Sequence, residues 1–255
     1  MSPLTKEQPV AGSAPSACHV EPMASIDDSG LTDFYERVLV PNFPADELEA
    51  EANFIASVRS GGTHVLAART PAGDILGGAV GDWFGGSQVA LLSYLAVRPG
   101  VRSGGIGTQL MAAATDAWTA RWNPRLLVAE IEDPRYHHAT AYGDPRARLR
   151  FYERLDVRFL PIPYFQPALG KSGRRVPGLM LMVFGGTVLP RREGMVNGAH
   201  VEEFLTEYFE VCEGPPATDD LQLKRLLEAC RAPGGLPLLS AAELPDPRNN
   251  EPGSL

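Results

Sequence analysis

One stretch, Leu91 to Met111, constrains the fold more than any other part of the chain. It runs L-L-S-Y-L-A-V-R-P-G-V-R-S-G-G-I-G-T-Q-L-M, which is typical of a strand, a tight glycine-rich loop and the first turns of a helix. Glycines let the main chain approach a ligand closely, and the free N–H groups at a helix N-terminus attract anions. Arg98 and Arg102 add positive charge nearby. The stretch therefore predicts a site for phosphate oxygens.

Two other glycine motifs do not fit this loop. A P-loop ends in G-K-[ST], whereas this loop ends in G-T-Q. A dinucleotide fingerprint requires G-x-G-x-x-G at the start of a parallel β-α-β unit, but Gly105 and Gly107 are followed by Leu110. Neither a nucleoside triphosphate nor a dinucleotide is therefore the expected ligand.

Hydrophobic periodicity and turn residues predict the elements on both sides of the loop. Before it, we expect two helices and a meander of three strands; after it, a helix, a strand, a second helix and two strands. This mixture indicates an α+β fold, in which helices cover a mixed sheet. The expected ranges are 29–39, 46–58, 63–68, 75–84, 89–97, 105–122, 126–131, 145–155, 157–160 and 176–184.

Beyond Gly185 the chain changes character. Apolar residues at helical spacing predict amphipathic helices over 200–212 and 221–230, and residues 191–255 carry most of the net negative charge. The apolar faces of these helices pack either on the core or on another subunit, and we predict a homodimer. We expect a disordered tail (1–17), a catalytic domain (18–186), an acidic helical extension (187–244) and a second disordered tail (245–255).

Charge and cysteine content exclude several partners. The chain has 23 Lys plus Arg against 31 Asp plus Glu, a net charge of −8, and no basic run, so we expect no nucleic-acid partner. No stretch approaches the ~20 apolar residues of a membrane span, and the first residues do not resemble a secretory signal. Cys18, Cys212 and Cys230 lack the spacing of a disulfide framework or a zinc site. We therefore expect a cytoplasmic protein without membrane partner or metal.

Two phrases of the sequence resemble a known family. The pattern [QR]-x-x-G-x-[GA] is matched by Arg102, Gly105 and Gly107, directly after the strand phrase L-x-V-R-P. A helix phrase F-Y-E-R-L-G-[FV] is matched by residues 151–157, except that Asp156 replaces the glycine. Asp tolerates the left-handed conformation that this position usually adopts. With the order of elements, these phrases resemble the GNAT superfamily of acyl-CoA-dependent N-acyltransferases over about two thirds of the chain.

The resemblance implies a GNAT-like fold with a central, mostly antiparallel mixed sheet, and it implies an acyl-CoA cofactor, acetyl-CoA by default. The main chain at the end of the strand would face the pantetheine arm, and one amide there would polarise the thioester carbonyl. The loop and first helical turn would cradle the pyrophosphate. The alternative is a buried strand with a structural turn. The implied residues are Leu95, Ala96 and Val97 on the strand and Arg102, Ser103, Gly104, Gly105, Ile106, Gly107 and Thr108 in the loop and helix.

The resemblance also implies direct attack of an amine on the thioester. Tyr152 occupies the place of a family tyrosine that protonates the departing sulfur, although it is equally typical of a core aromatic. Glu130 and Glu132 lie two apart, hence on one face of their strand, near the place where the family's sheet opens. We favour Glu130 as the base because it lies further inside the strand. In the alternative, Glu132 and Asp133 are solvated charges at the strand end.

The sequence gives fewer indications of the residues that would bind the acceptor. Tyr35, Phe43 and Glu47 lie where the family's first two helices form a wall of the acceptor cleft, and His137 and His138 fall in a long aromatic loop. The histidines either bind substrate or belong to a surface loop, and no second ligand at metal spacing accompanies them. Ser93 and Tyr94 should point to opposite faces of their strand, so we expect only one of them to face the cleft.

Three functions remain open at this stage. The first is an enzyme that moves an acetyl or other acyl group from acyl-CoA to a primary amine of a small molecule, for which the acidic balance favours a cationic acceptor. The second is a catalytically silent acyl-CoA-binding module whose acidic helices serve as a regulatory interface. The third is a protein N-acyltransferase whose C-terminal helices dock a polypeptide.

Overall fold

The computed structural model describes residues 18–23, 26–45, 47–101, 104–169, 173–189 and 194–245. The two expected tails, 1–17 and all but the first residue of 245–255, lie outside the described residues. So do Arg102, Ser103 and Asp46. The elements before the glycine loop are β1 (His19–Pro22), α1 (Asp28–Phe34), a π-helical turn (Tyr35–Leu39), α2 (Glu51–Ser60), β2 (Thr63–Arg69), β3 (Ile75–Phe84) and β4 (Val89–Val97).

The second half of the chain carries more helix and shorter strands. Its elements are α3 (Ile106–Trp122), β5 (Leu126–Glu132), α4 (Pro145–Glu153), β6 (Arg158–Phe159), β7 (Phe165–Gln166), β8 (Val176–Pro177), β9 (Leu179–Gly185), β10 (Met195–Val196), α5 (Gly198–Glu213), α6 (Leu221–Cys230), β11 (Leu236–Pro237) and a 3-10 turn (Ala241–Glu243).

Short polar side chains fix where the helices begin. Asp27, Asp144, Asn197 and Asp220 each precede a helix and accept a hydrogen bond from a backbone N–H of its first turn. The cap of α1 is Asp27, whose carboxylate accepts from the N–H of Gly30 at 2.9 Å. The end of α4 is also determined by a nearby residue. Asp156, just after this helix, adopts a φ of 56°, the left-handed conformation expected there.

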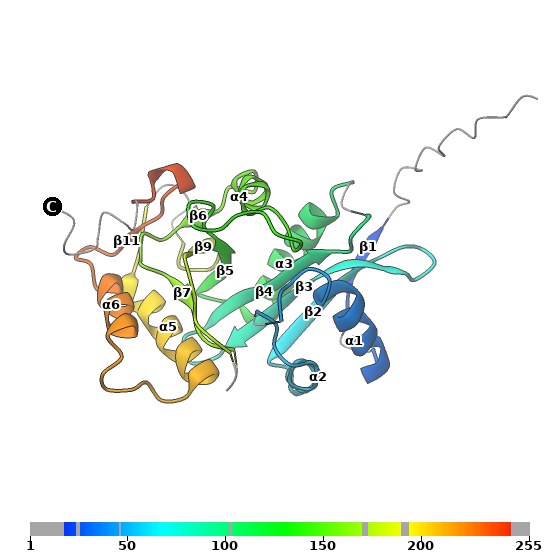
Figure 1. The fold of residues 1–255 in the computed structure, drawn as a ribbon, viewed down its shortest axis with the longest axis horizontal. Coiled ribbons are helices and arrows are strands. Elements are labelled where there is room, and N and C mark those ends of the chain that lie inside the picture. The colour runs from blue at the N-terminus through cyan, green and yellow to red at the C-terminus, as the bar shows by residue number, and fades with distance from the viewer. Residues whose placement is uncertain are drawn as a thin grey trace, which may run out of the picture.

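Seven strands form the main sheet, in the order β1-β2-β3-β4-β5-β9-β6 (Figure 1). Only β4 and β5 run parallel, and β9 lies between β5 and β6. The structure thus confirms the mixed, mostly antiparallel sheet flanked by helices. The strand expected over 176–184 is two strands, because Gly178, with a φ of 72°, separates β8 from β9.

Two irregularities in β4 position the functional site. The parallel pairing covers only Val89–Leu92 against Leu126–Ala129, so β4 and β5 part beyond these residues. At the same point β4 contains a β-bulge: Leu92 pairs with Gly81 and Tyr94 with Val80, which leaves Ser93 without a partner in β3. The bulge moves the following residues to the opposite faces of the sheet.

Helices cover both faces of the sheet. One face packs against α3 and α4, with Leu110, Trp118 and Tyr152 in that core. The other face is shared: α1 and α2 cover it over β2, β3 and β4, and α5 and α6 cover it over β4, β5 and β9. Figure 1 shows the two helix pairs at opposite ends of the molecule.

The apolar faces of α5 and α6 are buried within the chain. Val201, Phe204 and Phe209 of α5 and Leu226 of α6 are each at most 2% exposed and belong to the core cluster that includes Leu181 of β9. Of the two possibilities for these faces, packing on the core is therefore correct. The homodimer stays a prediction. The apolar faces of α5 and α6 no longer support it, because they are covered within the chain. No helix in the described part of the chain is long and apolar enough to span a membrane.

Candidate functional site

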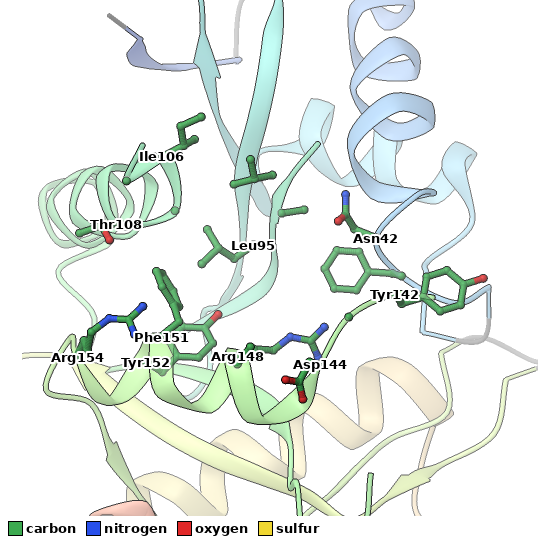
Figure 2. Close-up of a pocket in the computed structure, with 17 residues that line it drawn as sticks. Asn42, Leu95, Ile106, Thr108, Tyr142, Asp144, Arg148, Phe151, Tyr152 and Arg154 are labelled. Atoms are coloured by element: carbon green, nitrogen blue, oxygen red, sulfur yellow. The ribbon is translucent and has the colours of Figure 1, made fainter. Parts of the chain in front are cut away.

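Two adjoining pockets occupy the place where β4 and β5 part. The larger, about 420 Å³, lies between the N-terminus of α3, the end of β4 and the side of α4 (Figure 2). The smaller, about 60 Å³, lies between β4 and β5. Both are lined by Phe43, Leu95, Arg148 and Tyr152, which therefore mark the junction of the two spaces.

The N-terminus of α3 forms one wall of the larger pocket. Gly105, Ile106, Gly107 and Thr108 line it, and Gly105 begins the helix with a φ of 77° and no side-chain cap. First-turn N–H groups have no acceptor within a helix, so they are available to an anion. The loop thus has the geometry for phosphate oxygens.

The other expected cofactor residues divide into three groups. Leu95, Ala96 and Val97 line the larger pocket, as the resemblance implied. Gly104 does not line it, and Arg102 and Ser103 lie outside the described residues. Arg98 does not line it either, because its guanidinium donates to the carbonyl of Ile75 at 3.0 Å.

Helix α4 and the loop before it form the opposite wall, of which the sequence analysis identified only Tyr152. Figure 2 shows the side chains of Phe151 and Tyr152 directed from α4 toward β4 and α3, while that of Arg148 extends along α4. Phe151 and Arg154 belong to the F-Y-E-R phrase, so that phrase was the available signal for them. The lining residues that the sequence analysis missed are Asn42, Tyr142, Gly143, Asp144, Ala147, Arg148, Phe151 and Arg154.

Gly107 offers a test of this wall. A Cβ at this position would lie 3.3 Å from the ring of Phe151, so valine at 107 would push the ring and narrow the cradle. We expect acetyl-CoA to raise the thermal midpoint of the wild type and Gly107→Val to lose most of that rise. Ala112→Val, on the exposed side of α3, is the matched control and should keep the full rise. An undiminished rise for the Gly107 variant would show that acetyl-CoA binds elsewhere.

Tyr152 is buried, 5% exposed, and lines both pockets. In Figure 2 its hydroxyl points into the space beside Leu95. Burial raises the pKa of Tyr152 well above its usual range, so the hydroxyl keeps its proton at neutral pH. A hydroxyl in this position can donate a proton to a leaving group at the junction of the pockets.

Glu130 lines the smaller pocket and accepts hydrogen bonds from three side chains. Tyr164 donates to Oε1, while the Gln166 amide (2.8 Å) and the Tyr208 hydroxyl (3.4 Å) donate to Oε2. Burial raises the pKa of the Glu130 carboxyl, and the three donors oppose that shift. A carboxylate held in this way can accept a proton from an amine in the pocket.

Glu132 also lines the smaller pocket, on the same face of β5, but its carboxylate already has two partners. Arg148 Nη1 lies 2.6 Å from its Oε2, and His137 Nδ1 lies 3.9 Å from its Oε1. Its neighbour Asp133 is 2% exposed and binds Arg135 at 2.6 Å, so the idea of a solvated charge is wrong for Asp133. Glu132 thus pairs with a charged guanidinium, whereas the hydrogen-bond partners of Glu130 are neutral side chains, and Glu130 stays the predicted base.

The expectation that only one of Ser93 and Tyr94 faces the cleft is wrong. Both line the smaller pocket, because the bulge interrupts the alternation of the strand. The Ser93 hydroxyl donates to the carboxylate of Asp82. The Tyr94 hydroxyl donates to the carbonyl of Glu47 at 3.2 Å, and the ring of Phe43 packs edge-on against Tyr94 at 5.0 Å.

Of the five residues expected to bind the acceptor, two line the smaller pocket. Phe43 and Glu47 line the smaller pocket. Tyr35 lines neither pocket, since its hydroxyl donates to the carbonyl of Glu49 at 2.7 Å. His137 and His138 do not line them either: Nε2 of His137 lies 2.9 Å from the carbonyl of Pro177, and His138 is exposed. Their role as substrate-binding residues stays a prediction, and neither pocket supports it.

The raised pKa of the Glu49 carboxyl gives the protein a measurable pH dependence of stability. Burial and the charge of Asp82 raise the pKa of Glu49 to about 7. Between about pH 4.5 and 7 the folded protein therefore holds a proton that the unfolded chain releases, so the free energy of unfolding falls as pH rises. One such proton allows a slope of at most about 1.4 kcal/mol per pH unit, and partial exposure makes it smaller. Urea unfolding of Glu49→Gln from pH 5 to 8 should show a weaker decline than the wild type; parallel curves would contradict the assignment.

Part of the chain matches a known protein family. Residues 60–156 match the family model "Acetyltransferase (GNAT) domain". That range runs from the end of α2 to the end of α4 and includes β4, the glycine loop, Glu130 and Tyr152. Residues 60–156 are therefore similar to a GNAT acetyltransferase domain, in agreement with the resemblance of the loop and helix phrases. No curated protein sequence matches it significantly.

Several solved structures of acetyltransferases are similar to this chain. A putative GNAT acetyltransferase from Bacteroides thetaiotaomicron aligns with a TM-score of 0.51 at 20% identity, covering 66% of this chain and 88% of that one. The ribosomal-protein-S18-alanine N-acetyltransferase from Escherichia coli aligns at 0.45 and 16%, covering 69% and 99%. A GNAT acetyltransferase from Elizabethkingia anophelis with acetyl-CoA bound aligns at 0.42 and 13%, covering 66% and 97%. The likeness of fold rests on the first of these alignments, whose TM-score exceeds 0.5.

Proposed function

We propose that the protein is an acyl-CoA-dependent N-acyltransferase that moves an acetyl group to the primary amine of a small molecule. The observation that carries the proposal is the junction of the pockets. There Tyr152 faces both spaces, Glu130 lines only the smaller one, and the open N-terminus of α3 lines only the larger one. A donor in one space and an acceptor in the other would meet between an acid and a base.

The larger pocket fits an acyl-CoA. The first-turn amides of α3 would hold the pyrophosphate, and the end of β4 would lie along the pantetheine arm. A main-chain N–H of Leu95 or its neighbours would polarise the thioester carbonyl and stabilise the oxyanion that forms there. The acyl carbon would then lie beside Tyr152.

The smaller pocket fits a primary amine. An alkylammonium with a pKa near 10 must lose a proton before it can attack, and Glu130 is placed to accept that proton. The amine nitrogen bonds to the acyl carbon, the carbon–sulfur bond breaks, and Tyr152 gives its proton to the departing sulfur. The second proton that the nitrogen loses on becoming an amide returns to the Tyr152 oxygen, and the proton on Glu130 leaves to solvent. A space of about 60 Å³ lined by Glu47, Glu130 and Glu132 supports a small and positively charged acceptor.

The test has two stages. Thermal unfolding with acetyl-CoA, longer acyl-CoAs, free CoA and NAD should give a shift of several degrees with the CoA compounds and none with NAD. Thiol release is then measured with acetyl-CoA and a panel of polyamines, amino sugars, amino-acid amines and peptides. Turnover of a small amine supports the proposal. Absence of any shift with CoA compounds would overturn it, and binding without turnover would favour a silent acyl-CoA-binding module.

A further inference from the structure

The donors to Glu130 come from two segments that are far from it in sequence. Tyr164 and Gln166 belong to the chain entering β7, 34 and 36 residues away. Tyr208 lies in α5, 78 residues away, within the C-terminal extension. Two other core-facing aromatic residues of α5 are phenylalanines, Phe204 and Phe209, whereas the position directed at Glu130 carries a hydroxyl. The extension therefore contributes a polar contact that packing alone does not require.

Arg175 forms ion pairs that connect the β7–β8 hairpin to the same extension. Its Nη2 lies 2.6 Å from Oε2 of Glu213 at the end of α5, and its guanidinium also pairs with Asp220, the N-cap of α6. The guanidinium lies over the rings of Phe165 in β7 and Phe209 in α5, 5.1 and 5.5 Å from their centroids. One side chain thus joins the hairpin to both helices of the extension.

We propose that the extension is a functional part of the acceptor site, in which Tyr208 is a positioning residue for Glu130 and Arg175 holds the hairpin that carries Tyr164 and Gln166. The inference rests on the proposed function, because it assigns Glu130 the role of base. The described lining of the larger pocket comes entirely from residues up to Arg154, so the extension acts on the amine side and not on the binding of acyl-CoA.

The expected readout is a pH profile. Tyr208 donates to the ionised form of Glu130, so loss of its hydroxyl raises the pKa of that carboxyl. The rate depends on ionised Glu130 and rises with pH, and this rising limb should therefore move to higher pH. The titratable or charged groups around Glu130 are Tyr164 before β7, Tyr208 and Cys212 on α5, Glu132 on β5, and Glu47, Arg148 and Tyr152 around the pocket. The charges of Asp82, Glu213 and Glu49 act in turn on Cys212.

The first variant is Tyr208→Phe, which removes one oxygen atom from a buried ring. We expect the rising limb of kcat/KM for the amine to move up by about 0.5 to 1 pH unit, with the rate recovering at high pH and the acetyl-CoA midpoint shift unchanged. Phe204→Leu is the control, because Phe204 stacks on Tyr208 at 5.5 Å and carries no donor. A purely structural role would lower the stability of both variants and move neither limb.

The second variant is Arg175→Met, which keeps an apolar stem over Phe165 and Phe209 but removes the charge. We expect a higher KM for the amine with unchanged acetyl-CoA binding. The Glu130 titration can also be followed without turnover, by NMR of carbon-13-labelled glutamate carboxyls in the wild type and Tyr208→Phe. An unmoved Glu130 titration in Tyr208→Phe would overturn the inference; failure of the wild type to acetylate any amine would instead overturn the proposed function.

Discussion

Replacing Tyr152 with phenylalanine is expected to lower kcat for every amine by about 10² or more, the usual contribution of a general acid. The ring stays, so the packing of α4 against β4 is kept and the acetyl-CoA midpoint shift should not change. What is lost is the only atom of Tyr152 that can protonate the departing sulfur. Steady-state turnover at saturating acetyl-CoA measures the effect.

A second tyrosine provides the control for this substitution. The hydroxyl of Tyr35 donates to the carbonyl of Glu49, and this tyrosine lines neither pocket. Tyr35→Phe should therefore keep kcat near the wild-type value while removing one hydrogen bond. If Tyr152→Phe turns over within twofold of the wild type with each amine tested, Tyr152 is a core aromatic and the acid lies elsewhere.

Replacing Glu130 with glutamine is expected to lower kcat/KM for the amine by about 10² or more and to abolish its rising limb with pH. A base acts only when ionised, and burial raises the pKa of this carboxyl, so the wild-type rate should increase as pH rises through that pKa. The amide of glutamine has the same shape and can still accept a hydrogen bond from Tyr164, but it cannot take a proton. The pH profile of kcat/KM distinguishes this loss from a fall in stability.

Glu132 is the matched comparison, because it lies on the same strand face and lines the same pocket. Its carboxylate pairs with Arg148, so Glu132→Gln should disturb that pair and retain the rising limb. If the limb disappears in Glu132→Gln and persists in Glu130→Gln, the roles of the two carboxylates are reversed.

Much of the fold could be predicted from local patterns. The strands β3 and β4 and the helix α6 have the bounds that periodicity gave them, since turn residues or a capping Asp220 mark their ends. β1 was missed because its four residues include only Val20 as a clear strand former, and pairing with β2 holds it in place. Such a strand depends on tertiary contacts that local propensity does not contain.

The site was predictable only where a contiguous motif carries it. The loop at Gly105 and Gly107 and the phrase around Tyr152 are local, and the structure places both on the larger pocket. The bulge at Ser93 has no sequence signal, so strand alternation gave the wrong orientation there. The environment of Glu130 depends on Tyr164, Gln166 and Tyr208, which only the folded sheet brings together.

The shared core of the sheet and the extension ties the acceptor site to the local stability of α5. Phe204, Tyr208 and Phe209 pack in one cluster with Leu91 of β4 and Leu181 of β9. Any fluctuation that opens α5 enough for its amide protons to exchange with solvent also separates Tyr208 from Glu130 and admits water beside that carboxylate. The lifetime of the ordered acceptor site is thus set by how rarely this helix opens, a quantity that amide hydrogen exchange along α5 reads directly.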